Sequence, residues 1–516
     1  MALGEQHMAS LTRVLSEERS AVRITGTVLT TLFGVTAAIN LGVLVTGATP
    51  YAMTHLVAAG LALYLLLEAR LHLRQSDAFG LLSPALLALV FHFFLSYLGT
   101  ITLAGFYPNA LGRFGYWLPD LDAVLTDTML LVGLAAFCML RGYALARPVV
   151  RRLRRMIERW PQVRREIRFD VGLVLSMQIV FLLLVAYAIN VGAFGMLSTE
   201  ATRAANRDIQ QFLNLGLAAG TLSYFLIILR YFERRAAGQA GSLEWTLVLI
   251  MIVIHVLVGA LSAFKSQIVF PFVIAGFAYF LATRRMPLSL IGFAVVALVL
   301  AYVVIEPFRS YLGLRGQPPD SVAEAIDAIG TAFTMRDELA SHKDITRAEK
   351  IMSRFDLSGM TALAMDYVDK GNLAPPLRRE FQDSILLAPV LAYVPRAIWQ
   401  NKPSYSPGVW FNQTVRGRWY DTSTSVAMGP VGYLYMAGGI VGVVLGFLGF
   451  GVLQALIFEG IGRVGAGGVI VYLGVAMTLV MIPTSFGPAV TGVLRMLPIV
   501  FVVQWMLLRP SHRRAG

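Results

Sequence analysis

The sequence predicts an all-α integral membrane protein with about twelve transmembrane helices. Hydrophobic residues make up 57% of the 516 residues and charged residues only 14%, and the mean hydropathy is +0.67. Apolar stretches recur at about the 20-residue length that a helix needs to cross a bilayer. They must be helical, because each backbone N–H and C=O group in hydrocarbon needs an internal partner. The predicted spans are 22–46, 50–69, 80–104, 121–145, 170–195, 209–232, 242–263, 266–283, 287–306, 427–449, 466–482 and 489–508.

The distribution of arginine predicts the orientation of these spans, since short cytoplasmic loops retain Lys and Arg. Arginines precede the first span and follow the even-numbered ones, most densely in the run from Arg147 to Arg168. Both termini are therefore predicted to be cytoplasmic. The net charge of +13 is explained by this topology and by attraction to membrane lipid head groups, so it does not indicate nucleic-acid binding. The stretch 151–155 is interpreted as a topology determinant, with a partner site as the alternative.

This topology divides the chain into three predicted parts. Residues 1–306 hold the first nine spans, 307–425 form a large polar loop outside the cytoplasm, and 426–516 hold the last three spans and a cytoplasmic tail. The single cysteine, Cys138, lies in the fourth predicted span. No disulfide can therefore hold the loop, and its order must come from packing.

The loop is predicted to be mostly helical. The stretch Ser321–Glu324 has the S-x-x-E form of a capping box, which predicts a helix over 322–340. A second helix is predicted over 344–369, ending before Pro375. A third apolar stretch, 385–394, is too short to cross the bilayer and contains proline, so it is interpreted as an interfacial or re-entrant segment.

Cations and aromatic residues alternate in the second half of the loop. Arginine offers a planar fork to phosphate oxygens, and tryptophan can stack on sugar faces. The alternative is an aromatic belt with arginines reaching the lipid head groups. The phosphate candidates there are Arg396, Arg416 and Arg418, and the sugar candidates are Trp399, Trp410 and Trp419.

Three further cations stand at predicted outer ends of the spans, namely Lys265, Arg309 and Arg495. Ionisable groups in a bilayer are costly unless they face partners or a wet cavity, so each is a functional candidate. Together with the loop arginines they predict a cationic pocket near the outer leaflet. The alternative is structural: Lys265 would reach the lipid head groups, and Arg495 would pair with an acid such as Glu306.

Candidate bases and metal ligands are sparse. His342 is the one histidine of the loop and is a candidate base. Asp120 lies at the outer start of the fourth span, where helix capping is the alternative role. His92 and His255 fall within spans without spaced ligand partners, so they are interpreted as hydrogen-bonded core histidines, and no metal site or cofactor is predicted.

Four segments in sequence order resemble the bacterial O-antigen and exopolysaccharide repeat-unit polymerases, the Wzy-type proteins of the O-antigen polymerase and ligase group. They are Lys265-Ser-Gln267 at an outer helix end, Ser353-Arg-Phe-Asp356 in the loop, the stretch 394–403, and the stretch 428–439 that opens span ten. The resemblance covers 260–445 in motif and the whole chain in topology. Two departures are Gly432, where many relatives carry an acid, and Lys265, where many carry arginine.

The resemblance implies a metal-independent glycosyltransferase of the GT-C type in the bacterial inner membrane. A glycan chain on undecaprenyl diphosphate would pass to the next lipid-linked repeat unit, with a polysaccharide chain-length regulator as a candidate partner. The departing diphosphate needs fixed cations, and the acceptor hydroxyl needs a base. The predicted cations are Lys265, Arg309, Arg354 and Arg396; the predicted base is Asp356, with His342 and Asp120 in reserve; and Tyr433, in the segment opening span ten, joins the substrate-binding candidates.

Two other classes remain open at this point. An O-antigen ligase shares the topology and the diphosphate leaving group, but it transfers the finished glycan to a lipid A core. A transporter or flippase would have repeat-related halves and ion sites near the membrane midplane. The sequence has no internal repeat and few charges at that depth, which favours the polymerase.

Overall fold

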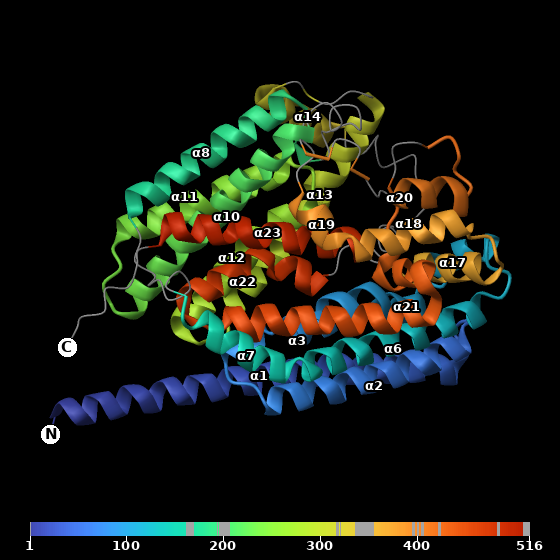
Figure 1. The fold of residues 1–516 in the computed structure, drawn as a ribbon, viewed down its shortest axis with the longest axis horizontal. Helices are drawn as coiled ribbons and strands as arrows, with labels where there is room; N and C mark the ends of the chain where they lie inside the picture. The colour runs from blue at the N-terminus through green and yellow to red at the C-terminus, as the bar shows by residue number, and fades with distance from the viewer. Residues whose placement is uncertain are drawn as a thin grey trace. The chain divides into compact units, whose positions relative to one another are not determined.

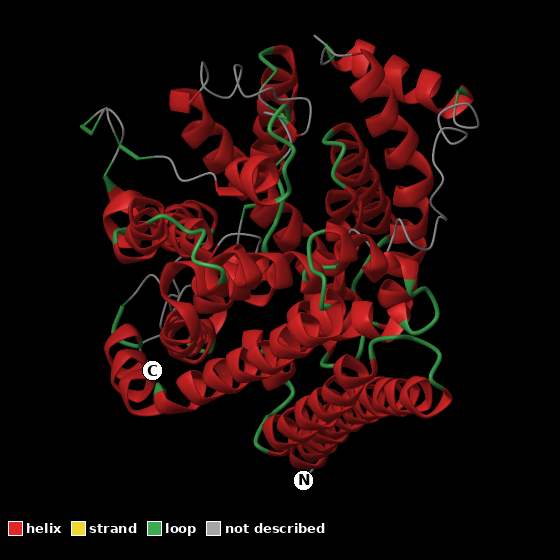
Figure 2. Ribbon diagram, turned by 90° about the vertical axis from the view of Figure 1, so that its right-hand side faces the viewer, coloured by secondary structure: helices red, strands yellow, loops and turns green. Residues whose placement is uncertain are grey.

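In the part of the chain that the computed structural model describes, helices are joined by turns and loops (Figure 2). That part comprises residues 2–160, 170–192, 194–195, 207–315, 319, 321–335, 356–394, 398–399, 402–403, 407–421, 425–481 and 486–508. It contains no strand, and ten of its helices are long and apolar enough to cross a membrane. The predicted fold class, an all-α multi-pass membrane protein, is therefore confirmed.

Each of the twelve predicted spans coincides with a helical segment. Ten of them meet the criteria of length and apolarity for crossing a membrane. The other two are α10 (Arg207–Ala236) and α22 (Gly465–Met481), the second of which has only 17 residues. Twelve crossings thus stay a prediction, whereas the helical character of these segments is established.

The chain divides into two compact units. The first unit comprises Met1–Ala21, Ile167–Asp344 and Val502–Arg509, and the second comprises Val22–Glu166, Ile345–Phe501 and Pro510–Gly516. The second unit therefore joins the first four predicted spans, most of the polar loop and the last three spans.

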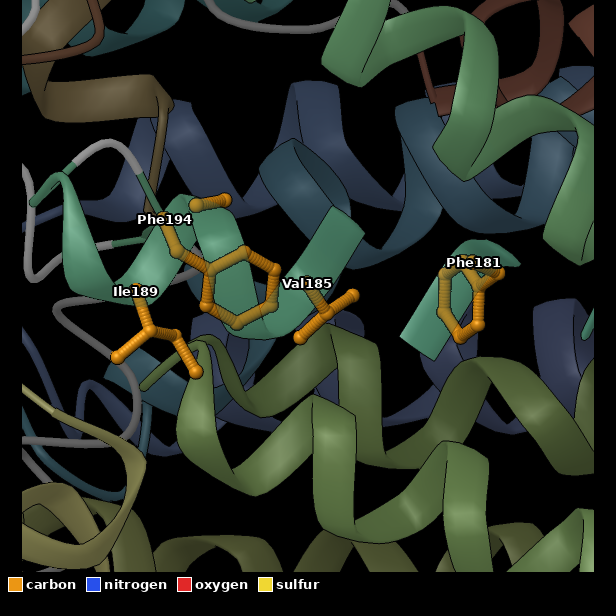
Figure 3. Close-up of a cluster of buried hydrophobic side chains, with 5 residues drawn as sticks. Phe181, Val185, Ile189 and Phe194 are labelled. Atoms are coloured by element: carbon orange, nitrogen blue, oxygen red, sulfur yellow. The ribbon is translucent and has the colours of Figure 1, made fainter. Parts of the chain in front are cut away.

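Among the described residues, the first unit contains six whole helices, which cover the fifth to ninth predicted spans and the start of the loop, and the ends of two helices that lie mostly in the second unit. Its core includes a cluster of Phe181, Val185, Ile189 and Phe194 (Figure 3). Because Phe181, Val185 and Ile189 recur at helical spacing, one face of α8 packs inward. The helices are α8 (Val171–Asn190), α10 (Arg207–Ala236), α11 (Ser242–Leu261), α12 (Lys265–Thr283), α13 (Leu288–Arg315) and α14 (Val322–Thr334).

A buried polar network joins three helices of the first unit. The Gln178 amide nitrogen donates to the Gly220 carbonyl at 2.6 Å and lies 2.6 Å from the Ser223 hydroxyl. The His255 ring nitrogen Nε2 lies 3.1 Å from the Gln178 amide oxygen. His255 is therefore a hydrogen-bonded core histidine, as predicted.

The second unit is organised around α6 and α21, which pack together along their lengths (Figure 1). The larger elements of this unit are α1 (Ala2–Thr46, from Val22), α2 (Ala52–Arg74), α3 (Pro84–Ala88), the π-helical η2 (Leu89–Leu98), α4 (Gly99–Ala104), α6 (Leu121–Leu145), α7 (Arg147–Ile157), α17 (Ser358–Asp369), α18 (Pro375–Leu386), α19 (Ala388–Tyr393), α20 (Pro407–Trp410), the π-helical η5 (Phe411–Val415), α21 (Gly429–Ala455), the π-helical η6 (Leu456–Gly462), α22 (Gly465–Met481) and most of α23 (Phe486–Leu507).

Two glycines allow α6 and α21 to approach each other closely. A Cβ atom on Gly142 would lie 2.1 Å from the Leu448 carbonyl oxygen, and one on Gly451 would lie 1.9 Å from the Met139 carbonyl oxygen. Both distances are far below van der Waals contact. Small residues bring helix backbones together in membranes in this way, so Gly142 and Gly451 are required for the crossing.

In the second unit, polar contacts join α2 to α6 at one end of the helices and join the segments after α2 and η6 at the other end. Spans that cross the membrane in alternating directions have their ends grouped in this way. Asp122 accepts the backbone N–H of Thr54 at 3.0 Å near the start of α2. Arg463 forms an ion pair with Asp77 just after the end of α2. Which end faces the cytoplasm remains the prediction made from the arginine distribution.

The predicted loop helices are confirmed in part. As predicted, α14 begins after Ser321, whose hydroxyl accepts the N–H of Glu324 at 3.2 Å, but it ends at Thr334 rather than at 340. The single helix predicted over 344–369 is wrong at its middle, because Asp356 and Leu357 are not helical and α17 begins only at Ser358.

The ninth span and the third apolar stretch also differ from their predicted limits. The helix predicted to end at 306 continues as α13 to Arg315, since Pro307 removes only one backbone donor and does not end it. The stretch 385–394 contains the end of α18 and the short α19. These pieces are too short to cross a bilayer, as predicted.

Candidate functional site

The candidate site lies in the second unit and begins with Asp356. This carboxylate is 5% exposed, and its Oδ1 atom accepts the backbone N–H groups of Ser358 at 2.9 Å and Gly359 at 3.3 Å. These are free donors of the first turn of α17, so Asp356 caps that helix. The cap explains why α17 begins at Ser358.

The end of η2 holds the chain beside Asp356 in place. The Leu357 N–H donates to the Ser96 carbonyl at 3.0 Å, and the Ser358 hydroxyl donates to the Tyr97 carbonyl at 3.3 Å. π-Helical turns of this kind are frequent at functional sites. The position of Asp356 is therefore set by a transmembrane segment rather than by the loop alone.

Arg113 is the ion-pair partner of Asp356. Its guanidinium Nη2 lies 3.3 Å from Asp356 Oδ2, and its side chain is 36% exposed. The guanidinium also lies over the Phe114 ring, 4.7 Å from the centroid. Burial raises the pKa of Asp356 above its ordinary value, although Arg113 and the two backbone donors act in the opposite direction.

Arg416 and Arg418 belong to a turn folded around the buried Asn412. The Arg416 Nη1 atom donates to Asn412 Oδ1 at 2.9 Å, and the Arg418 N–H donates to the Asn412 carbonyl at 3.1 Å. Gly417 between them has φ +68°, a conformation that glycine adopts readily. Asn412 in turn donates to Asp421 at 3.1 Å. The turn therefore fixes both arginines relative to one buried amide.

The three arginines form one cationic neighbourhood. The pKa of Arg416 is lowered from its ordinary value, first by burial and then by the positive charges of Arg418 and Arg113, while Asp421 opposes the shift. The Arg416 Nε atom is buried and has no hydrogen-bond partner among the described residues. Because like charges held together repel, an anion placed among them would be stabilised. We call Arg113, Asp356, Arg416 and Arg418 the arginine cluster.

Sequence reasoning missed Arg113, although a signal was present. Arg113 is the one arginine between the third and fourth predicted spans, on the side where the topology predicts few cations. Exposed aromatic rings also adjoin the cluster in sequence: Tyr116 is 87%, Trp419 78% and Tyr420 68% exposed. Of these, only Trp419 was predicted.

The other aromatic candidates have mainly packing contacts. Trp410 meets Tyr367 and Phe381 edge to face, with ring centroids 5.9 and 6.1 Å apart. Tyr433 is buried against Phe381, and its hydroxyl contacts Ser384. The substrate-binding role predicted for these residues stays a prediction.

Arg495 and the segment around Trp399 meet at the end of α19. The Arg495 Nη2 atom donates to the Leu391 carbonyl at 3.2 Å. The buried Lys402 ammonium donates to the same carbonyl at 2.5 Å and to that of Val394 at 2.8 Å, while its N–H donates to the Trp399 carbonyl at 3.1 Å. Cations at a helix C-terminus satisfy its last carbonyls, so Arg495 has a capping role.

Lys265 and Arg309 belong to the first unit. The Lys265 ammonium lies 2.6 Å from Glu306 Oε2 and 3.6 Å from the centroid of the Tyr302 ring. Glu306, considered above as a partner of Arg495, is thus paired with Lys265. Arg309 is half-buried within α13. A pocket shared by these cations and the loop arginines stays a prediction.

Four candidates remain: one of them caps a helix, and the other three lie outside the described residues. Asp120 accepts the N–H of Ala123 at 3.2 Å and caps α6, as its structural alternative predicted. His342, Arg354 and Arg396 lie outside the described residues. Within the described ranges, no group of three or more His, Cys, Asp or Glu side chains is arranged to hold a metal ion.

Comparisons of this chain with protein-family models, with characterised proteins and with solved structures gave no match. The arginine cluster is therefore interpreted from its own geometry and from the resemblance of the sequence motifs.

Proposed function

We propose that this protein is a polymerase of lipid-linked polysaccharide repeat units, a GT-C-type glycosyltransferase of the bacterial inner membrane. It would transfer a glycan chain from undecaprenyl diphosphate to the next lipid-linked repeat unit. The observation that supports this proposal is the arginine cluster, in which Arg113 pairs with the buried Asp356 and the charges of Arg113 and Arg418 act on Arg416.

The proposed reaction requires positive charge close to the leaving diphosphate. The bond between the anomeric carbon and the diphosphate oxygen breaks, and the lipid diphosphate leaves with the electron pair. The acceptor hydroxyl forms the new glycosidic bond and loses its proton. Fixed positive charges stabilise the leaving group because they need no reorganisation during the reaction. Arginine suits this role, since it keeps its charge and its planar fork matches phosphate oxygens.

The contacts of Asp356 favour a positioning role. One carboxylate oxygen accepts two backbone N–H groups, and the other faces Arg113. Asp356 would therefore orient the Arg113 guanidinium toward the diphosphate. A base for the acceptor hydroxyl is still needed, and Asp356 and His342 remain the candidates for it.

We expect Asp356→Asn to act through Arg113. The amide oxygen can still accept the N–H groups of α17, whereas the charge that holds Arg113 is lost. Polymerising activity should fall, and Asp356→Asn combined with Arg113→Ala should be no worse than Arg113→Ala alone. Rates of chain extension in isolated membranes, measured for the two single variants and the double variant, provide the check. Multiplying losses in the double variant would indicate an independent role for Asp356, such as that of the base.

Deletion of the gene in its native host tests the proposed function. The lipid-linked and surface polysaccharides of the deletion strain are separated by size and compared with those of the parent. Single lipid-linked repeat units in place of a ladder are the expected result. Full-length polymer that is not attached to its acceptor would instead identify a ligase. Repeat units trapped on the cytoplasmic side would identify a flippase, and an unchanged profile would contradict any role in polysaccharide assembly.

A further inference from the structure

A second cationic feature of the second unit is the helix α7, which contributes no residue to the arginine cluster. This helix follows α6 after Ala146, and Pro148 in its first turn cannot donate a backbone hydrogen bond to the α6 helix. Val150 and Ile157 are buried against α21 and η6 and the segment after it. One face of α7 is thus fixed on the protein.

A second face of α7 is apolar and exposed. Val149 is 56% exposed and Met156 50% exposed, and they lie two helical turns apart on one side of the helix. Trp160, just after the helix, is 45% exposed. Helical spacing places Arg152 beside this strip, since it follows Val149 by one turn and precedes Met156 by another. An apolar strip bordered by arginine is typical of a helix that lies in a membrane surface.

The third face carries the arginines, and most of them have no acidic partner. Arg151, Arg152 and Arg155 are exposed and form no ion pair with any described residue. Arg154 differs, because its guanidinium lies 3.1 Å from Glu158. Elsewhere in the same unit Arg463 is paired with both Asp77 and Glu459. Within the described part of the chain, no acidic side chain therefore offsets the positive charge of these three arginines.

We infer that α7 is an in-plane helix that binds the head groups of anionic phospholipids. Arg151, Arg152 and Arg155 contact lipid phosphates, while Val149, Met156 and Trp160 enter the boundary of the acyl chains. A topology determinant needs only the charges, so the exposed apolar strip beside them distinguishes a lipid-binding surface. The arrangement of charge and apolar area together selects a lipid surface over a soluble anion.

Lipid binding by the full-length protein tests this inference. The purified protein in detergent is titrated with phosphatidylglycerol or phosphatidylcholine, and bound lipid is counted by native mass spectrometry. We compare the wild type with Arg151→Gln/Arg152→Gln/Arg155→Gln. The control, Lys370→Gln/Arg378→Gln/Arg379→Gln, removes the same charge from exposed positions of α18 and of the turn that follows α17.

The preference of the wild type for phosphatidylglycerol should fall about five-fold for each α7 arginine removed, and it should persist in the control. Equal losses in both triple variants would show an effect of net charge alone and would overturn the inference, as would an unchanged preference in the α7 variant.

A second measurement does not depend on the triple variant. Brominated phosphatidylglycerol in nanodiscs quenches tryptophan fluorescence near the acyl chains. The quenched fraction should be smaller in Trp160→Phe than in the wild type, because Trp160 is placed at that boundary. An identical quenched fraction in the two proteins would contradict the in-plane position of α7.

Discussion

Replacing Arg113 with alanine is expected to abolish long polymer while single lipid-linked repeat units accumulate. Arg113 is held 3.3 Å from Asp356 and contributes to the positive field around Arg416. Loss of one donor to the developing charge typically lowers a catalytic rate by about 10²–10³-fold. The measurement is the chain-length ladder of a deletion strain that carries the variant, with membrane insertion verified by detergent extraction.

Two further variants make this result specific. Arg113→Lys keeps the charge but not the planar fork, so it should leave a shortened ladder. Arg379→Ala removes a cation whose side chain is 82% exposed, and it should leave the ladder unchanged. A ladder of normal length from Arg113→Ala would remove Arg113 from the reaction.

The second large effect is expected from Gly451→Leu, which should prevent folding of the second unit. A Cβ atom at this position would lie 1.9 Å from the Met139 carbonyl oxygen of α6. Backbone atoms cannot yield as a flexible side chain can, so α6 and α21 would have to separate. The yield of monodisperse protein after detergent extraction should fall to near zero.

Gly449→Leu is the matched control for that variant. Gly449 lies on the same helix, but a Cβ atom there would meet no atom within 4 Å. The control should yield protein at the level of the wild type. Equal yields of Gly451→Leu and the wild type would show that the two helices do not cross as closely as described.

The helical framework could be predicted from sequence because hydrocarbon requires helices, and apolar length locates them. The limits of the loop helices could not be predicted as well. The start of α17 depends on the Asp356 carboxylate and on carbonyls of η2, which are distant in sequence. Periodicity carries no information on such a cap, so the pattern predicted one continuous helix over 344–369.

Residue type predicted part of the candidate site. Arg416 and Arg418 were identified because arginine suits phosphate oxygens, and Asp356 because a carboxylate can act as a base. Arg113 was missed because its partnership with Asp356 joins segments far apart in the chain. Tyr433 differs from Arg113, because sequence reasoning did name it as a substrate-binding candidate. In the structure its ring is buried against Phe381. Only packing distinguishes a buried aromatic ring from one that faces a ligand.

The most direct measurement is of lipid diphosphate released by the purified full-length protein in vesicles. The substrate is the lipid-linked repeat unit that the deletion strain is expected to accumulate. We expect one released lipid diphosphate for each repeat added by the wild type, and rates of release and extension that are both about 10²–10³-fold lower in Arg113→Ala. Vesicles in which correctly folded wild-type protein gives no extension and no release would contradict the proposed function.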